Sequence, residues 1–289
     1  MYHIAMTQWI VGDEDIETSC RRLQKYGYNG IEFAAEPQKL DSGVCVSLMK
    51  QYGLDCRSLC GIFDESRDLT DSGDSGKNAV KYLKESVDFA VKTGAGVIIV
   101  VPSPVGRTVQ PKTKTLDELR NNAVKNIREA AAYAREHGVS LAIEAINRYE
   151  TYFANTLEKA YSLVRDIGHP SVGIMADLFH MSIEESSFSQ SLLMIQDKLL
   201  HVHIADNTRE PAGLGHTDFK EIIRILKKIG YDGSLTMEFM YRLADPYSST
   251  GIKTESNLMD LYAKQAIDYI KLMEHSAYSE TTGTDAVNG

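Results

Sequence analysis

Apolar and polar positions divide this chain into short apolar runs separated by longer mixed segments. Runs typical of buried strands occur at residues 3–9, 30–35, 55–63, 96–101, 140–145, 172–177, 200–205 and 234–239. Segments with the spacing of amphipathic helices follow at 13–26, 37–52, 76–93, 115–137, 156–167, more weakly near 185–197, and at 217–229 and 255–274. Eight strand–helix units in strict alternation predict an α/β fold with a parallel sheet, and eight strands close a barrel.

The same pattern predicts the domain boundaries. No linker rich in Pro, Gly or Ser interrupts residues 1–275, so we expect one (β/α)8 TIM-barrel domain. Glycine stands just past several helical segments, as in "YGYNG" and "KTGAG", where a left-handed cap turns the chain into the next strand. Residues 102–115 form the longest insertion after a strand. Residues 276–289 are polar and aperiodic, which predicts a flexible tail.

Charge and composition exclude several classes of protein. The 289 residues carry a net charge of −9 without a basic block, so nucleic acid is not an expected partner. The four cysteines form no C-x-x-C pair, which indicates a reducing, cytoplasmic location. The first residues lack the pattern of a signal peptide and no apolar run reaches membrane-spanning length, so no membrane partner is expected either.

The candidate site follows from the alternation of side chains along the last four predicted strands. Apolar residues occupy the helix-facing positions, which leaves four polar side chains facing inward near the strand ends: Glu144, Asp177, His203 and Glu238. Barrel enzymes build their sites at this face. Three carboxylates and an imidazole in an apolar interior would repel one another, so a divalent cation is predicted. Oxygen and nitrogen donors favour Mn²⁺, Mg²⁺ or Co²⁺ over a structural zinc.

Four segments in this part of the chain also resemble a known family. "IEAINRYET", "ADLFHMSIEE", "HVHIADNTR" and "TMEF" are similar to the signature segments of the tagatose/psicose (allulose) 3-epimerase group of xylose-isomerase-like barrels. The resemblance implies one Mn²⁺, Co²⁺ or Mg²⁺ ion, with Mn²⁺ as the first choice, on Glu144, Asp177, His203 and Glu238. It implies that Glu144 and Glu238 are also the acid/base pair of a reaction through a cis-enediolate. It implies that Glu150, His180 and Arg209 bind the sugar.

Two segments depart from that family's pattern. Ketose 3-epimerases carry an aromatic-rich loop, G-G-x-x-x-S-Y-W, where this chain has "VVPSPVGRTVQP", and their G-x-G-x-x-x-W is here "GLGHTDF". We therefore expect the reaction class to be kept and the substrate to differ. The first hypothesis is an isomerase or epimerase of an unphosphorylated ketose, inosose or related keto-sugar. The alternative is the large subunit of a C-glycoside deglycosidase, a lyase that cleaves 3-oxo-C-glycosides with a small partner subunit.

Other possibilities carry less weight. The negative charge argues against a DNA-repair endonuclease, and the sugar-binding positions argue against a barrel without catalysis. Related barrels form dimers or tetramers, so a homo-oligomer is expected, with "SLLMI" (191–195) as a candidate interface.

The roles of four further residues stay open. His201 either supports His203 from one layer below or faces the site itself. Glu32 is an inward acid that could stand behind the ligands. Trp9 either stacks on a sugar or caps the barrel mouth. His216 either contacts substrate or begins the helix after the seventh strand.

Overall fold

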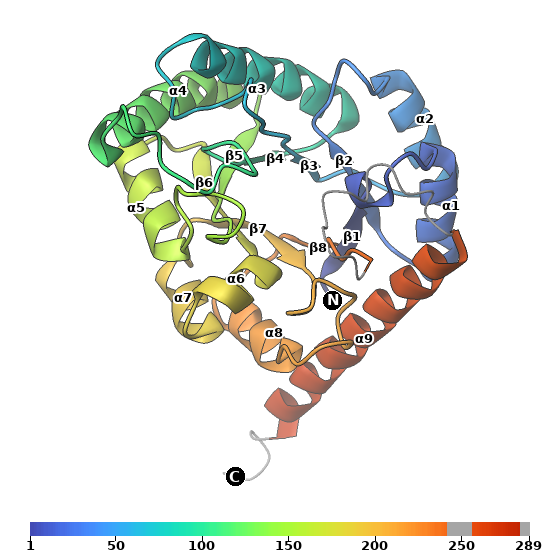
Figure 1. Ribbon diagram of the computed structural model, residues 1–289. Helices are drawn as coiled ribbons and strands as arrows, with labels where there is room; N and C mark the ends of the chain where they lie inside the picture. The colour runs from blue at the N-terminus through green and yellow to red at the C-terminus, as the bar shows by residue number, and fades with distance from the viewer. Residues whose placement is uncertain (242–255, 284–289) are drawn as a thin grey trace.

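A closed barrel of parallel strands lies at the centre of the molecule, inside a ring of helices (Figure 1). The computed structural model describes residues 1–241 and 256–283. The strands neighbour one another in chain order and β1 pairs with β8, which closes the barrel. They are β1 (His3–Thr7), β2 (Gly30–Ala34), β3 (Ser58–Cys60), β4 (Val97–Val100), β5 (Ser140–Glu144), β6 (Val172–Asp177), β7 (Leu199–Ile204) and β8 (Ser234–Met237). The predicted (β/α)8 TIM barrel is confirmed.

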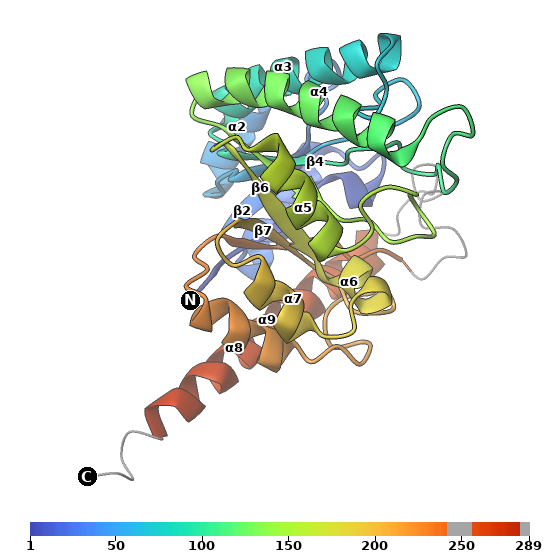
Figure 2. The same cartoon turned by 90° about the vertical axis from the view of Figure 1, so that its left-hand side faces the viewer.

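The helices cover the outside of the strands, with α3 and α4 on one side of the barrel and α8 and α9 on the other (Figure 2). They are α1 (Ile16–Tyr26), α2 (Ser42–Tyr52), α3 (Asp74–Thr93), α4 (Leu116–Glu136), α5 (Leu157–Ile167), α6 (Leu178–Glu184), α7 (Phe188–Met194), α8 (Phe219–Lys228) and α9 (Ser256–Gly283). A 3-10 turn, η1 (Trp9–Val11), follows β1. No helix in the described ranges is both long and apolar enough to cross a membrane.

Local capping chemistry sets several helix boundaries. Thr115 and Glu118 form a capping box at the start of α4, where each side chain binds the other residue's backbone N–H. Gly27 and Gly94 end α1 and α3 with φ of 77° and 84°, the left-handed conformation that a glycine adopts without steric cost. The predicted glycine caps are therefore present, and each turns the chain toward the next strand.

Two helical segments differ from the sequence prediction. The weak segment near 185–197 contains α7 alone, and a further helix, α6, precedes it, because the Asp177 carboxylate accepts a hydrogen bond from the His180 N–H at 2.9 Å and caps a helix directly after β6. Helix α9 continues to Gly283, so residues 276–283 are helical where an irregular tail was expected. The buried Ala277 anchors this last part to the core. Residues 284–289 lie outside the described ranges.

The stretch 191–195 packs into the protein's own core. Leu192 and Ile195 are fully buried, and Met194 is 37% exposed. Part of its apolar surface therefore packs against the barrel, while Leu193 and Met194 stay at least partly exposed, and the interface expected at this stretch stays a prediction.

Candidate metal centre and active site

Four polar side chains meet at the C-terminal end of the barrel, on the strands β5 to β8. Glu144 and Asp177 end β5 and β6, His203 lies in β7, and Glu238 directly follows β8. All four are buried, and their candidate ligand atoms lie within 4.8 Å of one another. Nδ1 of His203 is 3.3 Å from Glu238 Oε2 and 3.7 Å from Asp177 Oδ2. The structure thus brings together all four residues that strand parity selected.

The donor atoms of this cluster fit a divalent cation. Asp177 Oδ2 and His203 Nδ1 are buried and have no hydrogen-bond partner among the described residues. Leaving such polar atoms without a partner costs about 1–3 kcal/mol each. A cation between the four side chains would contact both atoms at once. Its oxygen-rich, sulfur-free donor set matches hard or borderline ions.

The cluster is electrostatically strained when only protons balance its charges. Burial raises the pKa of Glu144 well above its ordinary value, and the carboxylates of Glu238 and Asp177 add to the effect. Burial acts to lower the pKa of His203, but Glu238 and Glu32 outweigh it and raise that pKa well above its ordinary value. Metal binding must therefore displace protons from this cluster, which makes metal uptake dependent on pH.

A buried carboxylate supports His203 on the side away from the cluster. Glu32 Oε1 accepts a hydrogen bond from His203 Nε2 at 3.0 Å, and Oε2 lies 3.0 Å from His201 Nε2. Ser58 Oγ donates to the same Oε2 at 2.5 Å. With its Nε2 proton directed at Glu32, His203 presents the lone pair of Nδ1 to the cluster. His201 therefore supports His203 through Glu32 from the layer below, one of the two roles that the sequence left open.

His180 is oriented by an asparagine that sequence analysis did not single out. Asn147 Nδ2 donates to His180 Nδ1 at 2.8 Å, so the proton of His180 sits on Nε2, which faces Glu144 Oε1 at 3.7 Å. Burial lowers the pKa of His180 to about 3, so the ring is a neutral hydrogen-bond donor at neutral pH. The sequence offered a signal for Asn147, because it stands three residues before Glu150 in "INRYE", and its side chain donates to Glu150 Oε1.

Arg209 reaches the cluster from the loop between β7 and α8. Its backbone is left-handed, with φ of 61°, and its N–H and C=O are bonded to Asp206 O and Met240 N at 2.8 Å and 2.7 Å. The guanidinium contacts Glu150 Oε1 at 3.0 Å and lies 3.7 Å from Glu238 Oε2. Glu150, predicted to bind the sugar, thus contacts Arg209 and is not among the described residues that line the cavity below.

The other two open residues have clear positions. Trp9 Nε1 donates to Glu238 Oε1 at 2.9 Å, so its indole fixes one oxygen of that carboxylate at the barrel mouth. His216 is exposed and pairs with the Asn207 side chain at 2.9 Å, outside the cluster. It lies shortly before α8.

A cavity of about 710 Å³ opens above the cluster. On the side of the cluster, its lining includes Glu144, His180, Arg209 and Glu238. The loops after β1 to β4 form the opposite wall. The volume lies within the roughly 300–1,000 Å³ typical of small-molecule sites.

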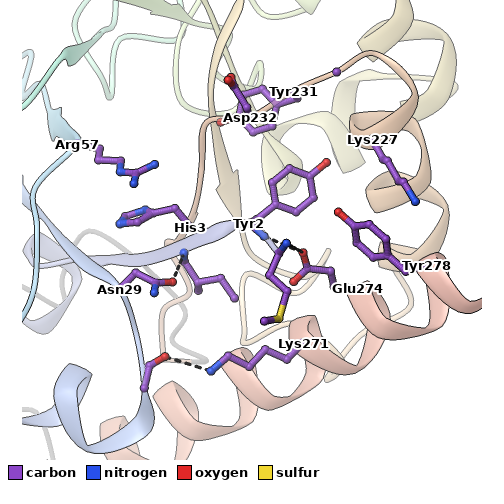
Figure 3. A pocket seen from close by; sticks show the side chains of 14 residues that line it. Tyr2, His3, Asn29, Arg57, Lys227, Tyr231, Asp232, Lys271, Glu274 and Tyr278 are labelled. Carbon is purple, nitrogen blue, oxygen red and sulfur yellow. Dashed lines mark hydrogen bonds and ion pairs between the residues drawn. The ribbon is translucent and has the colours of Figure 1, made fainter.

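A second cavity, of about 630 Å³, lies at the opposite end of the barrel, where His3 begins β1 and α9 passes alongside (Figure 3). Its polar groups are largely engaged with the protein itself. Glu274 accepts the Tyr2 N–H at 2.7 Å, and Lys271 Nζ donates to Gly27 O at 3.1 Å. None of the predicted site residues lines this cavity, so the candidate site is the one at the C-terminal end.

Fold and site together define a TIM-barrel protein with a cluster suited to a divalent cation at the mouth of the barrel. Residues 20–262 match the model of the xylose isomerase-like TIM barrel family, and the chain belongs to this family. The family-level resemblance found in the sequence is confirmed.

Individual relatives are sugar epimerases. An L-ribulose 3-epimerase from Methylomonas sp. is 29% identical over 252 residues, which cover 85% of this chain and 87% of that protein. A 3-dehydro-D-guloside 4-epimerase from Escherichia coli is 30% identical over 247 residues, covering 81% and 90%. The solved structure of an L-ribulose 3-epimerase has the same fold, with a TM-score of 0.87, 22% identity and full coverage of both chains. These similarities place the chain among epimerase- or isomerase-type enzymes.

Proposed function

We propose that this protein is a divalent-metal-dependent epimerase or isomerase of an unphosphorylated keto-sugar. The observation that carries the proposal is the pair of buried carboxyl groups of Glu144 and Glu238. They come from β5 and from the end of β8, both line the cavity, and both belong to the cluster suited to a cation. Two carboxyl groups on separate strands can reach a substrate carbon from different sides.

The pair supports proton transfer at the carbon next to a carbonyl. One glutamate, as a carboxylate, removes the proton from that carbon and leaves an enediolate. The other, as a carboxylic acid, returns a proton to the opposite face, and exchange with water restores both groups. One C–H bond breaks and one forms, so no oxidant is required. A divalent cation on Glu144, Asp177, His203 and Glu238 would supply positive charge that stabilises the enediolate; Mn²⁺ is our first choice, with Co²⁺ or Mg²⁺ as alternatives.

Neighbouring side chains would hold the sugar. Arg209 carries a fixed positive charge and His180 a neutral N–H donor toward the same cavity. Glu150, which contacts Arg209, would act mainly by holding the guanidinium in place. The described lining includes four acidic side chains and only Lys39 and Arg209 as basic ones, which disfavours a phosphorylated substrate.

Hydrogen exchange tests this proposal directly. The metal-loaded protein is incubated in D₂O with ketopentoses, ketohexoses and 3-oxo-glucosides, and NMR follows the hydrogen next to the carbonyl. We expect deuterium to enter at that carbon and an epimeric or isomeric sugar to accumulate. Failure of every sugar in the panel to exchange, with metal bound, would contradict the proposal.

The volume of the cavity is also compatible with the lyase alternative. A C-glycoside deglycosidase would also exchange the hydrogen, but it would release a free aglycone from a 3-oxo-C-glycoside and require its small partner subunit. Product analysis therefore separates the two functions: an epimeric sugar supports the first, and a released aglycone supports the second.

A further inference from the structure

The short helix α6 positions two of the groups that face the sugar in the proposed function. It carries His180 itself, and the ring of Phe179 lies against the Arg209 guanidinium, with 4.6 Å between the ring centroid and Cζ. A helix of seven residues makes only about two turns and is unstable in isolation. The position of α6 must therefore come from contacts at its ends. Asp177 supplies one at the N-terminal end, where it accepts the His180 N–H.

A second carboxylate joins the C-terminal end of α6 to the loop after β5. Glu184 Oε1 accepts the backbone N–H of Arg148 at 2.7 Å and its Nε–H at 2.9 Å, and Oε2 accepts from Nη2 at 2.7 Å. The Glu184 side chain is only 2% exposed. Three hydrogen bonds from one residue thus fix this loop on the end of α6.

The chemistry of α6 alone does not favour a carboxylate at this position. The C-terminal end of a helix carries partial negative charge, so an acidic side chain there is unfavourable, and α6 has no basic residue in its last turn. Compensation comes from another segment: the hydrogen bonds from Arg148 hold the pKa of Glu184 below its ordinary value. Glu184 is therefore explained by the contact between α6 and the loop.

This contact lies one residue from the amide that orients His180. The Tyr149 N–H donates to Asn147 Oδ1 at 2.9 Å, which settles the orientation of the amide and leaves Nδ2 as the group that faces the imidazole. Nδ2 donates to His180 Nδ1 at 2.8 Å and to Glu150 Oε1 at 2.9 Å. The hydrogen bond between Asn147 and His180 spans the same two segments that Glu184 joins, so its length depends on that junction.

We propose that Glu184 is a positioning residue of the sugar site. Through Arg148 it keeps Asn147 against His180, which holds the proton of that imidazole on Nε2. The inference rests on the proposed function, because His180 must donate to the sugar there. Glu184 is not among the described residues that line the cavity, so it touches neither the substrate nor the reacting atoms. It adds no chemical step and acts through the orientation of its neighbours.

The tautomer of His180 can be measured without any substrate. ¹⁵N-labelled protein is loaded with Mg²⁺, which is diamagnetic, and long-range ¹H–¹⁵N correlation spectra report which ring nitrogen carries the proton; His180→Gln identifies the signals. We expect Nε2–H alone in the wild type and a mixture of both tautomers in Glu184→Ala. Asn147→Ala removes the donor to Nδ1 itself and should give the same mixture.

Kinetics then show what the tautomer does for sugar binding. The sugar is the one that exchanges best in the D₂O panel. Loss of one positioned hydrogen bond should raise the KM of Glu184→Ala about tenfold and change kcat much less, because a group that binds the ground state and the transition state alike affects KM. Glu184→Gln keeps one acceptor oxygen for Arg148 and should show smaller changes in the same direction.

The next residue in the chain provides the matched control. Glu185 stands at the same helix end and also makes two hydrogen bonds, but it accepts from the Leu157 N–H at 2.8 Å and from Ser191 Oγ at 2.6 Å. These bonds join α6 to α5 and α7 and leave the loop after β5 untouched. Glu185→Ala should therefore keep the wild-type tautomer and KM. Equal effects of Glu184→Ala and Glu185→Ala would indicate a general loosening of α6 and overturn the inference.

The outcomes separate this inference from the proposed function. A folded Glu184→Ala that keeps His180 entirely as Nε2–H, with a wild-type KM, contradicts the role of Glu184. If Glu184→Ala does not fold, the same two wild-type results in Glu184→Gln contradict it instead. Absence of exchange with every sugar contradicts the proposed function, and the spectra alone then decide whether Glu184 orients His180.

Discussion

At the scale of single residues, both carboxylate oxygens of Glu238 contact other side chains of the site. Trp9 holds Oε1, while His203 and Arg209 lie near Oε2. Glu238→Gln keeps an oxygen that can face the cation but removes the proton acceptor. We expect a rate loss of roughly 10²–10⁴, the usual contribution of one acid/base group. Steady-state exchange rates, with the metal content measured in the same sample, check this prediction.

The matched control is Glu136→Gln on the exposed surface of α4, which should keep full activity. If Glu238→Gln retained wild-type exchange with metal bound, the assignment of Glu238 to proton transfer would be wrong.

Replacement of Glu32 tests how the residues behind His203 affect metal affinity. Its two oxygens each accept from an imidazole, an arrangement that an amide cannot reproduce, because its NH₂ group would face a ring N–H. Glu32→Gln should therefore weaken metal binding about 10–100-fold, the usual cost of losing a supporting hydrogen bond behind a ligand. Titration against a metal chelator measures the change.

A second carboxylate–imidazole pair provides the control. Asp55 contacts His3 at 2.6 Å at the opposite end of the barrel. Asp55→Asn should leave metal affinity unchanged, and a loss equal to that of Glu32→Gln would indicate a general effect on the fold.

At the scale of elements, the loop between β7 and α8 is organised by one buried carboxylate. Asp206 accepts backbone N–H groups of Asn207, Gly213, Gly215 and Thr217 at 2.8–3.1 Å. Burial acts to raise its pKa, but these hydrogen bonds outweigh it and hold the pKa below the ordinary value of 3.8. The same loop carries Arg209 in its left-handed conformation.

The lowered pKa of Asp206 sets the sign of a pH effect. A carboxyl with a lower pKa in the folded state stabilises the fold above its ordinary pKa, and this contribution is lost as the pH falls through the folded value. Asp206→Asn should cost about 1–2 kcal/mol at pH 7, and the difference from wild type should shrink below about pH 4. Urea unfolding of both proteins without metal checks this. A difference independent of pH would contradict the role of the charge.

At the scale of the whole molecule, the cluster joins the last four strands, so its occupancy should affect the stability of the entire barrel. A cation that binds only the folded state stabilises it by about 2.7 kcal/mol at a free concentration of about 100 Kd. We expect Mn²⁺ to raise Tm after treatment with a chelator and Asp177→Ala to abolish that rise. Differential scanning calorimetry with and without metal measures it.

Asp177 also caps α6, so its loss lowers stability without any metal. Asp177→Asn keeps an oxygen that can cap the helix and weakens the ligand charge, which separates the two effects. A metal-dependent rise in Tm that survives Asp177→Ala would contradict the predicted centre.

The sequence by itself determined the barrel and the composition of its central cluster. Alternation along a strand fixes which side chains face inward, and the parallel order brings the ends of the strands to the same face. Glu144, Asp177, His203 and Glu238 could therefore be selected without coordinates. The same reasoning did not predict that residues 276–283 are helical. They are mostly polar, and the sequence pattern does not indicate that Ala277 is buried against the core.

Only the tertiary structure decided which residues meet across the barrel and between its loops. Glu32 lies 171 positions before His203, and no local period relates them. Asn147 reaches His180, and Trp9 reaches Glu238, because closure of the barrel sets these separations in space. The wall of the cavity opposite the cluster likewise depends on how the loops after β1 to β4 pack, and such contacts follow from three-dimensional packing rather than from the spacing of residues along the chain.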